Sequence, residues 1–164
     1  MKRYVLHAEK EIVEEVFDVT SSSESLFDPS YNVFPGSPMP VVFHDSEREI
    51  KSAVWGISSK NEKITSFSKS EVEENSIKDM GLKPCLIPAS GFYLWKQSVN
   101  DKYPFYIRML GREVLGLAGL YQETEDKKGK KSLEYAVITK ASNVLLQPFQ
   151  PTMPCILDPE NFEQ

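Results

Sequence analysis

The sequence predicts an α+β fold in a single domain over residues 1–164, mainly antiparallel strands in barrel-like sheets with a few short helices. Eleven prolines and eight glycines interrupt the chain so often that few long helices can form, because proline removes a backbone donor and disfavours the preceding turn. Between these breaks the apolar residues gather in short runs of strand length. A length of 164 residues is that of one domain.

Two segments have helical patterns. In residues Glu9–Phe17 the apolar side chains recur on one side of a helix. In Ser70–Met80, Ser70 followed by Glu73 has the spacing of a capping box, and Gly81 marks the end. We therefore expect one short helix in each segment.

Seven segments have the composition of β-strands, with β-branched, aromatic and other apolar residues between turn residues. They are Met39–Phe43, Ile50–Trp55, Cys85–Pro88, Phe92–Trp95, Pro104–Met109, Val114–Tyr121 and Leu133–Thr139. The turn Leu110-Gly111-Arg112 predicts an antiparallel hairpin over Pro104–Tyr121. The charged stretch Glu123–Lys131 is interpreted as a solvated loop.

Composition excludes several classes of protein. No apolar run approaches the roughly 18 residues that span a bilayer, and the apolar stretch after Met1-Lys2-Arg3 is too short for a signal peptide. We therefore expect a cytoplasmic protein without membrane contact. The two cysteines lie in apolar segments and the two histidines are isolated, so we expect no disulfide, metal or cofactor.

The net charge of -5 argues against a general polyanion binder, because lysine and arginine supply most non-specific affinity for nucleic acid. The charge is unevenly distributed. Residues 1–50 hold four basic and ten acidic side chains, whereas the rest of the chain holds 15 basic and 14 acidic ones. A local basic groove in the second part is compatible with these numbers.

No pattern in the chain pairs a nucleophile with a base, and no glycine-rich loop is placed to hold phosphate. The most unusual segment is PCLIPASGFYLW, residues 84–95, which joins two expected strands through a short turn. Its aromatic residues are consistent with a core hairpin. Trp95 followed by Lys96 also has the makings of a stacking surface beside a phosphate contact.

This segment resembles the SRAP family, the SOS response-associated peptidase-like domain, whose members have Arg-Cys-Leu-Ile-Pro-Ala-Asp-Gly-Phe-Tyr-Glu-Trp at this point. Five other motifs resemble the family in the same order along the chain. They are Tyr31-Asn32-Val33-Phe34-Pro35, Trp55-Gly56-Ile57, Tyr103-Pro104-Phe105-Tyr106-Ile107, Leu117-Ala118-Gly119-Leu120-Tyr121 and Met153-Pro154-Cys155-Ile156-Leu157. The resemblance covers nearly the whole chain and implies an SRAP-like fold.

The resemblance also implies a chemistry. Family members use an N-terminal cysteine, exposed by removal of the initiator methionine, to attack the aldehyde of an abasic site in single-stranded DNA. The α-amine forms an imine and the thiolate closes a thiazolidine. An asparagine orients the site, a glutamate handles protons and a histidine acts as acid or base.

This chain replaces all four groups. The positions of the family's cysteine, asparagine, glutamate and histidine correspond to Lys2, Thr65, Leu94 and Gln150. Two family arginines that bind phosphate are replaced as well, by Phe67 and Thr152. The retained motifs are apolar residues, prolines and glycines, which serve packing and turns. The pattern therefore favours a pseudoenzyme over an active enzyme, and we expect Met1 to be retained because Lys2 is bulky.

The prediction for function is an SRAP-like protein of the DNA-damage response with an impaired site and weak binding of single-stranded DNA. Arg3, Asn32, Trp55 and Trp95 are the candidate nucleic-acid contacts. Two alternatives stay open. The α-amine of Met1 retains Schiff-base chemistry in one, and the old cleft serves a small molecule or a protein partner in the other. We expect a monomer.

Overall fold

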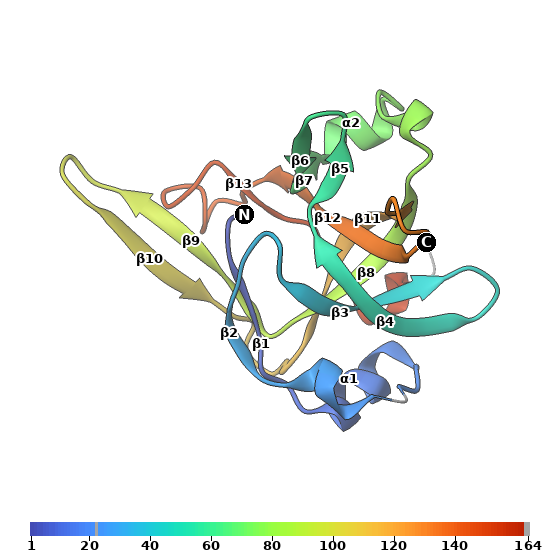
Figure 1. The fold of residues 1–164 in the computed structure, drawn as a ribbon. Coiled ribbons are helices and arrows are strands. Elements are labelled where there is room, and N and C mark those ends of the chain that lie inside the picture. Colours follow the sequence, from blue (N-terminus) through green and yellow to red (C-terminus); the bar gives the residue numbers. More distant parts are fainter. Residues whose placement is uncertain (22, 163–164) are drawn as a thin grey trace.

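The computed structural model describes residues 1–21 and 23–162 and is built around a closed barrel of five strands (Figure 1). The strand order is β12-β4-β3-β8-β11, and pairing of β11 with β12 closes the ring. All neighbours in the ring are antiparallel except the parallel pair β12–β4. The bounds are β3 (Pro38–His44), β4 (Arg48–Trp55), β8 (Lys83–Ala89), β11 (Leu115–Glu125) and β12 (Lys131–Ala141). The predicted fold class is confirmed.

Large apolar side chains fill the barrel because alternate residues of each strand point inward. Trp55, Ile87, Leu117 and Tyr135 are each at most 1% exposed. Gly119 lies where a Cβ atom would come within 2.6 Å of the Ile87 side chain, so this strand position admits only glycine without rearrangement. The glycines of β11 therefore serve close packing.

A second sheet of four strands, in the order β10-β9-β1-β2, extends from the barrel, and β9 and β10 reach outward from it (Figure 1). The bounds are β1 (Tyr4–Leu6), β2 (Ser30–Val33), β9 (Gly91–Gln97) and β10 (Lys102–Ile107). Strand β1 lies in the middle, between β2 and β9. This position places the first residues of the chain beside the segment 84–95.

The predicted hairpin over Pro104–Tyr121 is wrong. Strand β10 pairs with β9, whereas β11 pairs with β8, β12 and β14 in the barrel. Gly111 does make a turn, with φ of 76°, but the turn carries the chain from one sheet to the other. The physical reason is burial, since β11 is buried along most of its first seven residues and needs a strand on each edge.

The helix α1 (Lys10–Phe17) is confirmed, with Val13 and Phe17 buried. The expected helix Ser70–Met80 is instead α2 (Lys69–Glu73) followed by the 3-10 turn η2 (Lys78–Met80). The capping box uses Ser68 and Glu71, the same sequence spacing two residues earlier. Asn75, at φ of 54°, ends α2 because the Ser76 amide then donates to the Glu71 carbonyl at 3.1 Å.

All seven predicted strands overlap observed ones, and the shorter elements were not predicted. The expected loop Glu123–Lys131 is shorter than its composition indicates, because β11 continues to Glu125 and β12 begins at Lys131. No helix among the described residues is long and apolar enough to cross a membrane. The remaining elements are η1 (Glu24–Phe27), β5 (Ile57–Ser59), β6 (Glu62–Ile64), β7 (Ser66–Ser68), β13 (Thr152–Pro154), β14 (Ile156–Leu157) and η3 (Pro159–Asn161).

Candidate functional site

A cavity of about 420 Å³ brings together five of the residues singled out from the sequence. We call it the Met1 pocket. Its lining is Met1, Lys2, Arg3, Pro35, Thr65, Trp95 and Lys102. These residues come from the chain start, the segment after β2, the link between β6 and β7, and the strands β9 and β10. Segments far apart in sequence therefore converge on the α-amine of Met1.

Backbone hydrogen bonds hold the pocket walls in place. The Tyr93 amide donates to the Arg3 carbonyl at 3.1 Å, which fixes the chain start against β9. The carbonyl of Thr65 accepts two bonds, from the Val137 amide at 3.1 Å and from the Trp55 indole N–H at 2.9 Å. The Met1 pocket is therefore a built part of the fold.

Trp55 requires a correction to the predicted role. Its side chain is 1% exposed and packs beside Tyr4 and Tyr135, with ring centroids 5.4 and 6.4 Å away. A ring with no exposed face cannot stack on a base. Its indole N–H instead positions Thr65 at the edge of the Met1 pocket.

The electrostatics of the Met1 pocket favour an uncharged amine and an anionic ligand. Burial, followed by the charge of Lys2, lowers the pKa of the Met1 α-amino group below its usual value. Three cationic side chains line the pocket, and no carboxylate of residues 1–21 or 23–162 does. The Arg3 guanidinium also lies 5.1 Å from the centre of the Phe34 ring, in cation–π contact.

The residues aligned with the family's glutamate and histidine do not line the Met1 pocket. Leu94 is fully buried and points into the core, whereas its neighbour Trp95 lines the pocket. The side-chain oxygen of Gln150 accepts a long hydrogen bond of 3.4 Å from the Trp95 amide. Gln150 therefore lies close to the pocket wall without being part of the lining. Among the described residues, no thiol, carboxylate or imidazole lines this cavity.

A second cavity of about 330 Å³ shares Arg3 and Trp95 with the Met1 pocket. We call it the aromatic pocket, and its other lining residues are Tyr31, Asn32, Tyr93 and Pro104. Tyr93 lies 5.5 Å from Tyr106 between ring centroids, and its hydroxyl donates to the Tyr31 carbonyl at 3.2 Å. The indole N–H of Trp95 is buried and has no partner in the described part of the chain. The aromatic pocket therefore extends the Met1 pocket along β9 with aromatic rings and the Arg3 guanidinium.

Sequence reasoning missed Tyr93 and Tyr31. The interpretation of the aromatic residues in segment 84–95 as a core hairpin holds for Phe92, which is fully buried, but not for Tyr93, which is half-buried. The missing signal was the alternation of the strand, since Tyr93 lies two residues before Trp95 and shares its face. Asn32 and Arg3, two of the candidate nucleic-acid contacts, line the aromatic pocket.

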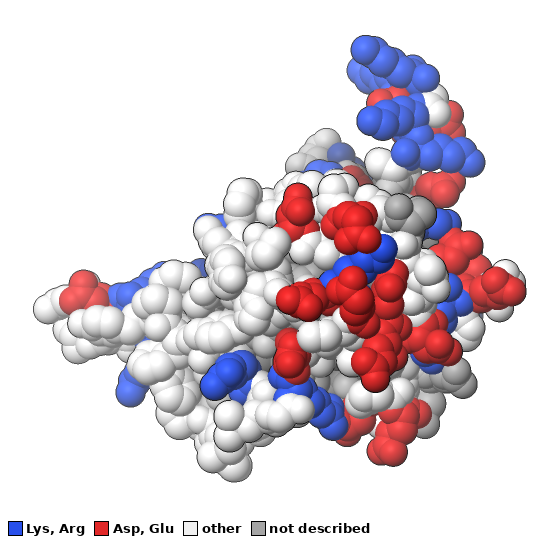
Figure 2. All heavy atoms as spheres, turned by 90° about the horizontal axis from the view of Figure 1, so that it is seen from below, with Lys and Arg blue, Asp and Glu red and all other residues white. Residues whose placement is uncertain are grey.

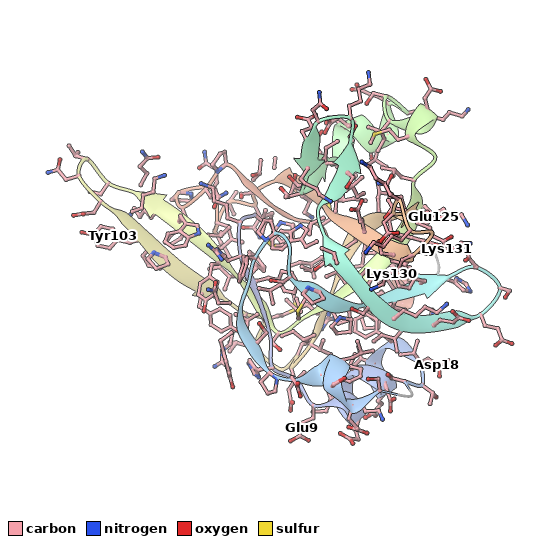
Figure 3. The ribbon with its side chains drawn as sticks, viewed as in Figure 1. Glu9, Asp18, Tyr103, Glu125, Lys130 and Lys131 are labelled. Atoms are coloured by element: carbon pink, nitrogen blue, oxygen red, sulfur yellow. The ribbon has the colours of Figure 1, made fainter. Side chains whose placement is uncertain are left out.

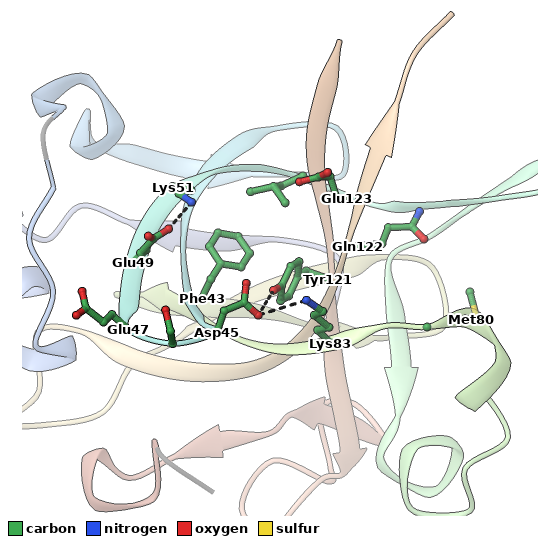
Figure 4. A pocket seen from close by; sticks show the side chains of 13 residues that line it. Phe43, Asp45, Glu47, Glu49, Lys51, Met80, Lys83, Tyr121, Gln122 and Glu123 are labelled. Carbon is green, nitrogen blue, oxygen red and sulfur yellow. Dashed lines mark hydrogen bonds and ion pairs between the residues drawn. The ribbon is translucent and has the colours of Figure 1, made fainter. Parts of the chain in front are cut away.

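A third cavity, about 580 Å³, surrounds Asp45 just after β3, whereas Pro35 of the Met1 pocket precedes that strand (Figure 4). We call it the barrel mouth. Phe43 and Tyr121 form its floor in edge-to-face contact with centroids 4.6 Å apart. Four of its charges pair with one another: Asp45 accepts from Lys83 at 3.3 Å, and Lys51 pairs with Glu49. Asp45 also accepts from the Tyr121 hydroxyl at 3.4 Å. None of the predicted site residues is here.

Beside the barrel mouth, Glu134 is a buried carboxylate with four donors. Ser58 donates its amide and its hydroxyl, each at 2.7 Å, Lys63 donates at 2.6 Å and Gln122 at 3.0 Å. Burial acts to raise the pKa of Glu134, but these hydrogen bonds outweigh it and lower the pKa to about 2. Glu134 therefore fastens the β5–β6 hairpin to the barrel as an anion.

The described residues contain no cluster of three or more histidine, cysteine or acidic side chains arranged to hold a metal ion. Both cysteines are buried, and burial raises the pKa of each thiol. The chemistry available in the Met1 pocket is that of an amine, three cations and an aromatic ring.

Two solved structures share this fold. A protein from Bordetella bronchiseptica matches 99% of this chain with 86% of its own, at a TM-score of 0.82 and 16% identity. A protein from Bacteroides thetaiotaomicron matches 99% of this chain with 79% of its own, at a TM-score of 0.77 and 21% identity. At these identities the likeness concerns the fold.

Sequence comparison identifies closer relatives. The abasic site processing protein YoqW of Bacillus subtilis is 30% identical over 171 residues, 97% of this chain and 76% of that protein. The abasic site processing protein HMCES of Xenopus tropicalis is 28% identical over 80% of this chain and 51% of its own length. The family model for the SOS response associated peptidase (SRAP) matches residues 2–164. Because that match spans almost the entire sequence, the chain belongs to the SRAP family.

Proposed function

We propose that this chain is a DNA-damage protein of the abasic-site type that binds single-stranded DNA and has lost the chemistry of a stable cross-link. One observation carries the proposal. The Met1 pocket keeps an amine, cations and a stacking ring, but none of the described residues that line it supplies a thiol, carboxylate or imidazole. The names of the relatives, abasic site processing proteins, supply the class of substrate.

The binding part of the proposal depends on charge and stacking. Lys2, Arg3 and Lys102 can neutralise phosphates, and Arg3 is shared by both pockets. Trp95 offers a ring on which a base can stack, worth about 1–3 kcal/mol. Asn32 adds an amide to the aromatic pocket. Trp55 contributes indirectly, through its bond to Thr65.

The chemical part depends on the balance of the reaction. The α-amine and the abasic aldehyde form an imine and release water, and this step is reversible. In the family, a thiolate then adds to the imine carbon and closes a ring. Lys2 carries no sulfur, and neither Leu94 nor Gln150 can move a proton as a carboxylate or an imidazole can. We therefore expect the reaction to stop at the imine.

A denaturing gel tests this proposal. Purified protein is incubated with a single-stranded oligonucleotide that contains one abasic site, and wild type is compared with Lys2→Cys. We expect no stable band from wild type. In the variant a small residue follows Met1, so methionine removal exposes a thiol, and we expect a covalent band. A stable wild-type band at a yield equal to that of the variant would overturn the proposal.

The lowered pKa of the Met1 amine favours a second candidate, residual Schiff-base chemistry. A larger neutral fraction of the amine at neutral pH makes it the better nucleophile. Borohydride added during the incubation reduces the imine to a stable amine, so a band should arise only with reductant. Acetylating the α-amine should remove it, and an undamaged oligonucleotide should give none. A band that survives acetylation would exclude Met1.

The net charge of -5 favours a third use of the cleft, for a small molecule or a protein partner. Binding of single-stranded DNA with a strong salt dependence would count against this alternative. Absence of DNA binding at low salt would favour it over the first two.

A further inference from the structure

The hairpin formed by β11 and β12 projects beyond the body of the protein and ends in lysines. Figure 2 shows this projection as a group of basic side chains standing clear of the surface, and Figure 3 labels Glu125, Lys130 and Lys131 on it. We call residues 126–131 the lysine tip, and its basic residues are Lys127, Lys128, Lys130 and Lys131. All of these residues are exposed.

The lysine tip is a well-defined turn. One carboxylate oxygen of Asp126 accepts from the amides of Lys128 and Lys130 at 2.8 and 2.9 Å. The Asp126 amide donates to the Lys130 carbonyl at 2.9 Å, and Gly129 has the positive φ, 78°, that the turn requires. Below the turn, the hydroxyls of Thr124 and Ser132 lie 3.0 Å apart across the strands. The lysines are therefore presented on a rigid base.

Three of the four lysines have no ion pair within the part of the chain that the structure describes. Lys131 pairs with Glu123 at 3.2 Å, whereas no acceptor lies within reach of the ammonium groups of Lys127, Lys128 and Lys130. The nearest acidic side chain in sequence, Asp126, directs an oxygen at the backbone. Glu125 lies on the same hairpin, so the lysine tip presents three ammonium groups without an ion pair beside one carboxylate.

We propose that the lysine tip is a second contact for nucleic acid, which binds the phosphate backbone of a strand held in the Met1 and aromatic pockets. The inference depends on the proposed DNA binding, and it adds a separate element to it. Strand β12 connects the lysine tip with the Met1 pocket, since the Val137 amide on this strand donates to the carbonyl of Thr65, which lines the pocket. Lys130 lies seven residues before Val137, which is about 23 Å along an extended strand.

That separation sets the length of DNA that can reach the lysine tip. A stacked strand advances about 3.4 Å per nucleotide, so about seven nucleotides are needed beyond the pockets. An oligonucleotide of about five nucleotides can fill the pockets only, whereas one of about 20 can also contact the lysines. Dependence on the lysines should therefore appear only with the longer probe.

The experiment measures affinity for these two single-stranded DNA probes over a range of salt concentrations. The test variant is Lys127→Gln/Lys128→Gln/Lys130→Gln. The control variant, Lys10→Gln/Lys51→Gln/Lys83→Gln, has the same net charge but replaces lysines that already pair with carboxylates. Trp95→Ala is measured in parallel to report on the pockets.

We expect the test variant to bind the long probe about tenfold more weakly at low salt, with the slope of log K against log salt reduced by about two. Binding of the short probe should be unchanged, and the control variant should resemble wild type. If Trp95→Ala weakens binding while the test variant does not, this inference is overturned and the proposed function stands. If wild type binds neither probe, the proposed DNA binding fails first. Equal losses on both probes would also overturn the inference, because they indicate general electrostatic attraction.

Discussion

The two ends of the barrel differ in how their charged side chains are paired. At the barrel mouth, Asp45, Lys83, Glu49 and Lys51 pair with one another, and beside it Glu134 accepts four hydrogen bonds. At the Met1 end, three cations line a pocket to which the described part of the chain contributes no carboxylate. The larger cavity is thus the one in which most of the charged side chains are paired. The comparison indicates that cavity volume alone does not identify a functional site, and that unpaired charge is the better guide.

The largest expected effect is on stability, and it comes from replacing Glu134 beside the barrel mouth. Replacing Glu134 with alanine leaves Ser58 and Gln122 without their buried acceptor, and bonds to a charged group contribute about 1.5–3 kcal/mol each. We expect Glu134→Ala to lower the free energy of unfolding by about 2–4 kcal/mol, measured by urea denaturation. Glu123→Ala, which removes only an exposed pair with Lys131, is the control and should cost about 0.5 kcal/mol or less. Equal losses from the two variants would contradict the assignment.

The second prediction uses pH. The pKa of Glu134 is about 2 in the folded chain against the usual 4.5, so the unfolded chain takes up the proton first as pH falls. The stabilisation is therefore complete above about pH 4.5 and is lost between about pH 4.5 and pH 2. It amounts to at most about 3 kcal/mol. The difference in unfolding free energy between wild type and Glu134→Gln should shrink over this range, and a constant difference would refute the assignment.

The third prediction concerns the Met1 end, where a change should affect binding and leave stability nearly unaltered. We expect Trp95→Ala to weaken binding of single-stranded DNA by about tenfold, because one stacked base contributes about 1–3 kcal/mol. Tyr103→Ala is the matched control. It also removes a partly exposed ring, but Tyr103 pairs with Lys96 in the register and lies on the opposite face from Trp95. Equal losses of DNA affinity from both variants would contradict the assignment of binding to the face of the sheet that carries Trp95.

The smallest effect is expected at the barrel mouth itself. The pair of Asp45 with Lys83 is exposed on both sides, and such pairs contribute about 0–1 kcal/mol. Asp45→Asn should change the free energy of unfolding by about 0.5 kcal/mol or less and should leave DNA affinity within about twofold. A large loss of stability would mean that this end of the barrel depends on its charges as strongly as Glu134 does.

Much of the barrel could be predicted from the sequence because its strands are short apolar runs between turn residues. The same local signal could not assign partners. Strand β10 and strand β11 are separated by a short turn at Gly111, yet they belong to different sheets. Partner choice depends on which faces are buried, and this is a property of the whole fold.

The fold brings together some of the residues that the sequence singled out. Met1, Lys2, Arg3, Thr65 and Trp95 do line one pocket. The prediction of Trp55 as a nucleic-acid contact is wrong, because a tryptophan before a glycine is compatible with both a core and a surface position. Only its burial in the folded chain distinguishes the two. The hydrogen-bond cluster around Glu134 could not be predicted from the sequence. Its donors come from three strands, and no spacing in the sequence connects them.

The hydroxyls of Tyr4 and Tyr135 meet in the core at 2.6 Å, although they are 131 residues apart in the chain. Strand β1 also lies between β2, the next strand along the chain, and β9, where Tyr4 pairs with the distant Phe92. Contacts between such distant residues form late in folding, because closing long loops costs entropy before any contact is gained. The position of Met1 in its pocket therefore depends on contacts between residues far apart in the chain. The lowered pKa of this amine, which comes first from burial, is therefore a property of the folded chain.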